Sequence, residues 1–226
     1  MTGLRGLDLT QQLILLLAAL VLFTSFVMLA QSRLVGLVRV FAWQGVLLAV
    51  TTGLVAHVSG HAHLYISALL TLFLKGLLIP WILHRLVIRL GLERKREADA
   101  NRTLVQLGGA SLVIFSYYVA LPAVQLSTLF TRNTIAVSLA VVLLGLLLMI
   151  VRRKAVSQVV GFMSMENGLF FAAVVATYGM PMVVELGIAF DVLVAAILFG
   201  VVFLQIRASI DSLDVDRLNR LNESEP

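Results

Sequence analysis

Four polar side chains that could do chemistry stand in the middle of long apolar runs: Lys75, Glu166, Asp191 and Gln44. At about 1.5 Å per helical residue, each lies roughly 15–17 Å from one end of its run, which is near the centre of a bilayer core about 30 Å thick. Glu185 precedes Asp191 by six residues, about 9 Å nearer the outer face. Inserting a charged side chain at mid-depth costs about 2.5–3.5 kcal/mol on insertion scales. Because several residues here carry this cost, we expect them to have a function.

The chemistry that these residue types predict is proton transfer. Burial favours the neutral form of a carboxyl group, whereas a nearby ammonium group favours its charged form. Glu166 and Asp191 are therefore the expected proton carriers, and Lys75 is the charge that tunes them. Glu185 and Gln44 are secondary members of the relay. In the structural alternative, Lys75 pairs with one acid to hold helices together, or some carboxyl groups are simply protonated.

The histidines give weaker predictions about function than the four mid-depth residues do. His84 ends the third apolar run and is either an interfacial anchor or an exit for the Lys75 site. His57, His61 and His63 fall in or near the second loop. The last two have H-x-H spacing, but no carboxylate accompanies them, so exposed loop histidines are expected. The sequence has no cysteine, which excludes disulfides, iron–sulfur clusters and thiolate metal sites. We expect no cofactor, no metal site and no catalytic residues in this chain.

The elements that must hold these residues are membrane helices. Of the 226 residues, 60% are hydrophobic and 13% are charged, whereas soluble domains average about 25% charged. The first apolar run is nearly twenty residues long, more than the roughly 7–15 of a signal-peptide core, so a retained helix is expected. The predicted fold is all-α, a polytopic protein with seven transmembrane helices at 12–31, 34–56, 64–84, 104–125, 133–151, 155–177 and 181–206.

The loop charges predict the orientation. With seven helices, one side carries only Arg5 and Arg132, and Lys75 belongs to neither side. By the positive-inside rule, the N-terminus is outside and the C-terminus cytoplasmic, in a bacterial inner membrane. The basic pI of about 10.1 then reflects topology, and no nucleic-acid partner is expected. The other side carries the remaining basic residues: Arg33, Arg39, Arg85, Arg89, Arg94, Lys95, Arg96, Arg102, Arg152, Arg153, Lys154, Arg207, Arg217 and Arg220.

The chain is expected to be one membrane domain containing a parallel repeat. In each half a short basic turn joins two helices, the second helix carries Gln44 or Glu166, and a third helix carries Lys75 or Asp191. The predicted parts are a first three-helix set at 1–92, a connector helix at 104–125, and a second three-helix set with a cytoplasmic tail at 133–226.

Two families resemble parts or all of this sequence. The segment from Val159 to Gly168 resembles the glutamate-bearing second helix of the K subunit of respiratory complex I, and 191–211 resembles that subunit's last helix and tail. Asp191 stands where the second glutamate of that family is expected, one methylene shorter. The whole chain, with the phrases at 165–168 and 184–187, resembles the hydrogenase-4 component E family.

The second resemblance implies a non-redox membrane subunit of a group 4 nickel–iron hydrogenase or formate hydrogenlyase complex. Its partners would be antiporter-like membrane subunits and a soluble hydrogenase arm that holds the metal centres. The function expected is proton or cation translocation coupled to electron transfer. Two alternatives stay open: a component like the C subunit of multisubunit cation/proton antiporters, and a purely structural scaffold for antiporter-like subunits.

Overall fold

The computed structural model describes residues 9–92, 101–121, 129–176, 186–198 and 200–201, and every element in these ranges is a helix. Helices α1 (Leu9–Ala30) and α2 (Leu34–Ser59) are followed by one continuous helix made of α3 (Ala62–Thr71), the π-helical turn η1 (Leu72–Leu78) and α4 (Ile79–Arg89). Then come α5 (Arg102–Ala120), α6 (Leu129–Val151) and α7 (Ala155–Ala176), and a last apolar helix at Leu186–Leu198.

The predicted all-α membrane fold is confirmed. Six helices of the described chain are long and apolar enough to cross a membrane, and the described part of the last helix is apolar but shorter. Its order and place in the chain fit the seventh predicted span.

The connection between α2 and α3 is tighter than the sequence predicted. Gly60 ends α2 with a positive φ of 69° and donates its N–H to the Ala56 carbonyl, a left-handed cap that glycine adopts without steric cost. Only Gly60 and His61 separate the two helices. His57 therefore lies in the last turn of α2 and His63 in the first turn of α3.

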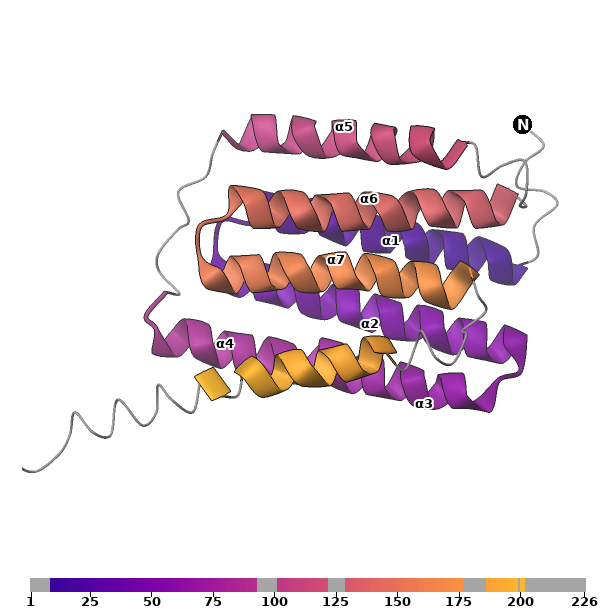
Figure 1. Cartoon of the computed structure of the whole chain (residues 1–226), viewed down its shortest axis with the longest axis horizontal. Coiled ribbons are helices and arrows are strands. Elements are labelled where there is room, and N and C mark those ends of the chain that lie inside the picture. The colour runs from indigo at the N-terminus through magenta and orange to yellow at the C-terminus, as the bar shows by residue number, and fades with distance from the viewer. Residues whose placement is uncertain (1–8, 93–100, 122–128, 177–185, 199, 202–226) are drawn as a thin grey trace, which may run out of the picture.

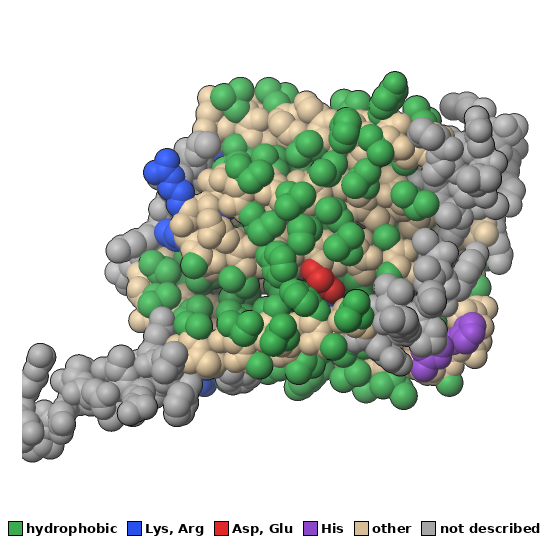
Figure 2. All heavy atoms as spheres, viewed as in Figure 1, with side chains coloured by type: hydrophobic (Ala, Val, Ile, Leu, Met, Phe, Trp, Pro, Cys, Tyr) green, Lys and Arg blue, Asp and Glu red, His purple; other side chains and the backbone are tan. Residues whose placement is uncertain are grey.

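The helices lie side by side, and their turns alternate between two ends (Figure 1). The α1–α2 and α6–α7 turns share one end with the last turn of α4 and the first turn of α5. The Lys and Arg side chains visible in Figure 2 gather at this same end, and the histidine side chains visible there lie at the opposite one. We call the first of these the basic end.

The buried core is divided in two at mid-length. One hydrophobic cluster includes Leu29, Leu34, Leu83 and Val156 near the basic end. The other includes Ile14, Ala56, Leu64 and Val174 toward the far end. Between the clusters, five helices carry buried polar residues: Ser25 on α1, Gln44 on α2, Lys75 on η1, Asn167 on α7 and Asp191 on the last helix. A polar layer thus crosses the bundle at half depth.

Candidate functional site: an ion triad at mid-depth

Lys75 lies in the only π-helical turn of the described chain, Leu72–Leu78. Pro80 explains the irregularity, because its ring and missing N–H remove the normal bond to the Gly76 carbonyl. The Ile79 N–H instead donates to the Leu74 carbonyl, five residues back. Such π-turns often occur at functional sites, and this one places Lys75 at the middle of the Ala62–Arg89 span.

The Lys75 side chain is fully buried and contacts two carboxylates from two other helices. Its Nζ donates a hydrogen bond to Oε2 of Glu166 on α7 and lies 3.5 Å from Oδ1 of Asp191 on the last helix. The same ammonium group stands over the Phe170 ring, 4.9 Å from its centroid, a cation–π contact. The three ionisable residues expected to form a relay are therefore neighbours, and we call them the ion triad.

Asp191 forms the closed side of the ion triad. Its side chain is 0% exposed, and neither carboxylate oxygen has a hydrogen-bond partner within the described residues. A buried carboxylate normally satisfies its oxygens with several hydrogen-bond donors. The Asp191 carboxylate is therefore held in place less firmly than the Glu166 carboxylate, which accepts a hydrogen bond from Lys75.

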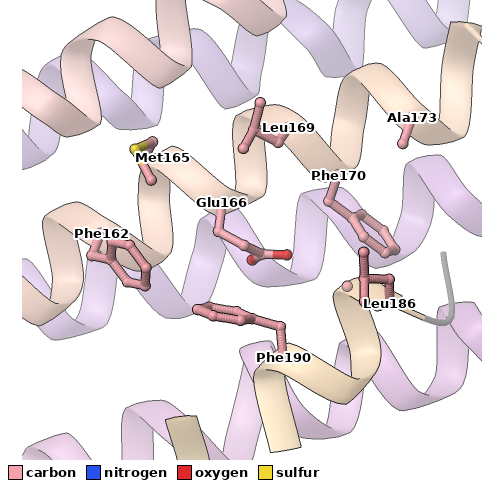
Figure 3. A pocket seen from close by; sticks show the side chains of 9 residues that line it. Phe162, Met165, Glu166, Leu169, Phe170, Ala173, Leu186 and Phe190 are labelled. Carbon is pink, nitrogen blue, oxygen red and sulfur yellow. The ribbon is translucent and has the colours of Figure 1, made fainter. Parts of the chain in front are cut away.

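Glu166 forms the open side of the ion triad. Its side chain is 12% exposed, and Figure 2 shows acidic atoms on a face that is otherwise hydrophobic. A cavity of about 300 Å³ lies beside it, between α7 and the last helix. Figure 3 shows the carboxylate reaching between these helices, with the rings of Phe162, Phe170 and Phe190 around it. Access to the triad from outside the bundle therefore passes through Glu166.

Close approach of the last helix to α7 depends on Gly187. A Cβ at this position would stand 2.8 Å from Cδ2 of Phe170 and 3.5 Å from Oε1 of Glu166. Since real Cβ atoms do not approach ring carbons so closely, a larger residue would have to displace the Phe170 ring or the last helix, and either change would disturb the surroundings of the triad.

An amide chain continues the polar layer from α7 to α1. Asn167, next to Glu166, donates from Nδ2 to Oε1 of Gln44 at 3.0 Å. Gln44 donates in turn from Nε2 to the Ser25 hydroxyl at 2.9 Å, and Ser25 donates to the Val21 carbonyl at 3.1 Å. Gln44 is thus placed in the polar layer, linked to the triad through the neighbour of Glu166.

The other predicted site residues lie apart from the triad or outside the described residues. His84 follows Lys75 by nine residues and lines a different cavity near the basic end. Glu185 lies outside the described residues. The rings of His61 and His63 are 5.4 Å apart and edge-on, and no group of three His, Cys, Asp or Glu in the described chain could hold a metal ion.

Sequence reasoning missed three participants. Asn167, Ser25 and Phe170 were not among the predicted site residues. Two signals were present: Phe170 follows Glu166 by four residues and so shares its helix face, and Ser25 is a polar residue well inside an apolar run.

Comparison with known proteins supports a relationship over most of the chain. No protein-family model matches the sequence. No solved structure matches it. The chain is 34% identical over 191 residues to the uncharacterised protein Rv0085 of Mycobacterium tuberculosis, covering 83% of this chain and 86% of that protein. It is 28% identical over 147 residues to hydrogenase-4 component E of Escherichia coli K12 and of Shigella flexneri, covering 65% of this chain and 68% of those proteins.

The relatedness to a hydrogenase-4 membrane component is therefore supported, while the resemblance to the K subunit of complex I stays a prediction. The chain belongs to the family of the mycobacterial protein Rv0085 and is related, more distantly, to hydrogenase-4 component E.

Proposed function

We propose that this chain is a non-redox membrane subunit of a respiratory-type hydrogenase complex, in which the ion triad takes part in proton or cation translocation coupled to electron transfer. The name of the hydrogenase-4 relatives supports the assignment to such a complex. Its partners would be antiporter-like membrane subunits and a soluble hydrogenase arm.

The observation that carries the proposal is the contact of Lys75 with both Glu166 and Asp191 at mid-depth. With Lys75 as an ammonium, two carboxylates leave one negative charge in excess. An uncompensated charge is costly in a low-dielectric interior, so the triad as a whole favours holding one additional proton. Such a site can load and release a proton when the position of Lys75 changes.

The two acids have different access, which suggests a direction of exchange. Asp191 is sealed, whereas Glu166 borders the cavity between α7 and the last helix. Glu166 would exchange protons with a neighbouring subunit through this opening, and Asp191 would hold the proton while Lys75 pairs with Glu166. The amide chain through Asn167 and Gln44 extends the polar layer toward the first repeat.

A structural scaffold is the second candidate, and one observation favours it. The triad joins η1, α7 and the last helix in a closed set of ion pairs, and the Gln44–Asn167 hydrogen bond joins α2 to α7. Such contacts could hold the bundle together without moving a proton. The antiporter C-subunit alternative has no comparable support, since the hydrogenase-4 relatives match over most of their length.

The finer parts of the assignment belong to the same proposal. We place the chain in a bacterial inner membrane with the basic end in the cytoplasm. We also propose that 1–92 and 133–226 are parallel three-helix repeats joined by the connector at 104–125. The similar positions of Gln44 in α2 and Glu166 in α7, ten and eleven residues after the first residue of each helix, support this repeat.

Replacing Glu166 with Gln in the assembled complex tests the function. Inverted membrane vesicles would be driven by hydrogen turnover, and dye quenching would report acidification. We expect Glu166→Gln to lower acidification per hydrogen turned over, while assembly on native gels and hydrogen turnover with an artificial redox partner persist. Ser164→Ala is the control, because Ser164 is buried on the same helix outside the triad. Normal acidification with Glu166→Gln would favour the scaffold.

A further inference from the structure

A second cavity, of about 280 Å³, lies between the first turns of α2 and α4. Its polar lining comes from Arg39 of α2 and from His84 and Trp81 of α4, and all three side chains are exposed. Its apolar lining is Val35, Val38, Ala42 and Pro80. The cavity is separate from the ion triad, and the proposed function does not use it.

Arg39 and His84 stand at matching depth. Arg39 follows the first residue of α2 by five positions, and His84 precedes the last residue of α4 by five. Both ends belong to the basic end of the bundle, so each residue lies about 7.5 Å inside it. In a bilayer whose surface lies at the helix ends, this depth corresponds to the boundary between headgroups and acyl chains.

The charge around the cavity is positive. The acidic side chains of the described residues are Glu166 and Asp191, and both belong to the ion triad at mid-depth. Arg85 adds a guanidinium group over the outer ring of Trp81, 4.5 Å from its centroid. An anion at the cavity mouth would therefore meet Arg39 and His84 with no described carboxylate competing.

The flank around the cavity is suited to lipid. Trp81 is 47% exposed, and on the same helix Leu77 and Ile88 are 61% and 47% exposed. Exposed tryptophan is typical of the membrane interface, and Trp81 lies on α4 about one turn deeper than His84. A ligand seated here would place its charged part on Arg39 and His84 and its apolar part along Ala42 and Pro80, which lie deeper in the bundle.

We propose that this cavity binds the headgroup of an anionic phospholipid in the leaflet at the basic end, with an acyl chain along the apolar lining. Basic cavities between membrane helices commonly hold such headgroups. We call it the lipid site. The ligand is a membrane lipid rather than free phosphate because the lining joins the Arg39 guanidinium group and the His84 imidazole to an apolar wall that faces the lipid flank.

Trp81 itself supplies the probe for a test. The sequence has two tryptophans, and Trp43, which is 62% exposed on α2, can be replaced by Phe so that Trp81 alone fluoresces. The full chain with W43F would be reconstituted in phosphatidylcholine containing brominated phosphatidylglycerol or brominated phosphatidylcholine. Quenching of Trp81 against lipid fraction gives the preference for the anionic lipid.

We expect a preference for phosphatidylglycerol that falls about fivefold when the Arg39 charge is removed from the lining, since a basic residue near the membrane is worth about 1 kcal/mol toward anionic lipid. Arg39→Gln should lower the preference and Arg39→Lys should keep it. Arg33→Gln is the matched control, because Arg33 is an exposed arginine at the start of α2 that does not line the cavity. The combined Arg39→Gln and His84→Gln variant should show no preference.

Three results would overturn the lipid site. They are equal quenching by the two brominated lipids, an equal loss of preference in Arg33→Gln and Arg39→Gln, and displacement of the anionic lipid by inorganic phosphate at constant ionic strength. Circular dichroism of each reconstituted variant confirms that the helices are retained, and Arg39→Lys supplies the test if Arg39→Gln fails to fold.

Discussion

Gly45 of α2 lies directly against the backbone of Lys75. A Cβ at position 45 would stand 2.7 Å from the carbonyl carbon and oxygen of Lys75 and 3.0 Å from the Gly76 nitrogen. Backbone cannot yield as a flexible side chain can, so α2 and the π-turn approach each other only because residue 45 has no side chain. The position of the Lys75 ammonium is therefore set by α2 as well as by Pro80.

Gly45→Ala should destabilise the protein by about 1–3 kcal/mol, the usual cost of overpacking, and should displace Lys75. Gly53→Ala, two turns further along α2, is the control, because a Cβ there meets only Ala68 at an ordinary 4.0 Å. Thermal unfolding in detergent measures both. Equal stability of the two variants would show that α2 does not hold the π-turn.

Lys75→Met should destabilise the fold by about 3–5 kcal/mol, because removing one partner of a buried ion pair leaves the others uncompensated. Adding Glu166→Gln and Asp191→Asn to the same chain should recover most of this loss, since no charge then remains in the triad. Unfolding of both variants in mixed detergent measures the difference. If the triple variant were no more stable than Lys75→Met, the loss would come from packing rather than charge.

The hydrogen bond between Gln44 and Asn167 should contribute about 0.6 kcal/mol and at most about 1.7 kcal/mol, the range found for polar pairs between membrane helices. A double-mutant cycle with Gln44→Ala and Asn167→Ala isolates it. Ser164→Ala is the comparison, because the Ser164 hydroxyl is buried on the same helix with no hydrogen-bond partner among the described residues. Ser164→Ala should leave the free energy of unfolding nearly unchanged. A coupling energy of zero between Gln44 and Asn167 would contradict the proposed amide chain.

Reporter fusions test the orientation of the bundle. Alkaline phosphatase, which is active only outside the cytoplasm, should be active when fused after Gly60 and inactive when fused after Lys154 or at the C-terminus. The reason is that most basic loop residues lie on the side of Lys154, and that side stays cytoplasmic. Phosphatase activity at the C-terminus would reverse the proposed topology.

The sequence was most informative about depth. Lys75, Glu166 and Asp191 are ionisable residues in apolar runs, so counting from the run ends predicts a common level without knowing how the helices pack. Which of them touch could not be predicted, because these helices are apolar on nearly all sides and no polar face marks the buried one. Only the structure shows that Lys75 contacts both acids at once.

Local backbone detail was predicted in part. Pro80 indicated a disturbed helix near Gly76, but whether the turn becomes a kink or a π-turn depends on the neighbouring α2 and the close approach of Gly45. The bounds of α2 and α3 were set too short because His57 and His63 were read as loop residues, whereas the left-handed Gly60 lets both helices continue almost to the turn.

The most direct test of the central proposal is the proton yield of a complex that carries both Glu166→Gln and Asp191→Asn. Acidification of inverted vesicles would be measured against hydrogen turned over in the same sample, with assembly checked on native gels. We predict that the assembled double variant turns over hydrogen but acidifies the vesicles no more than uncoupled membranes do. Unchanged acidification per hydrogen would contradict a proton-carrying role for the ion triad.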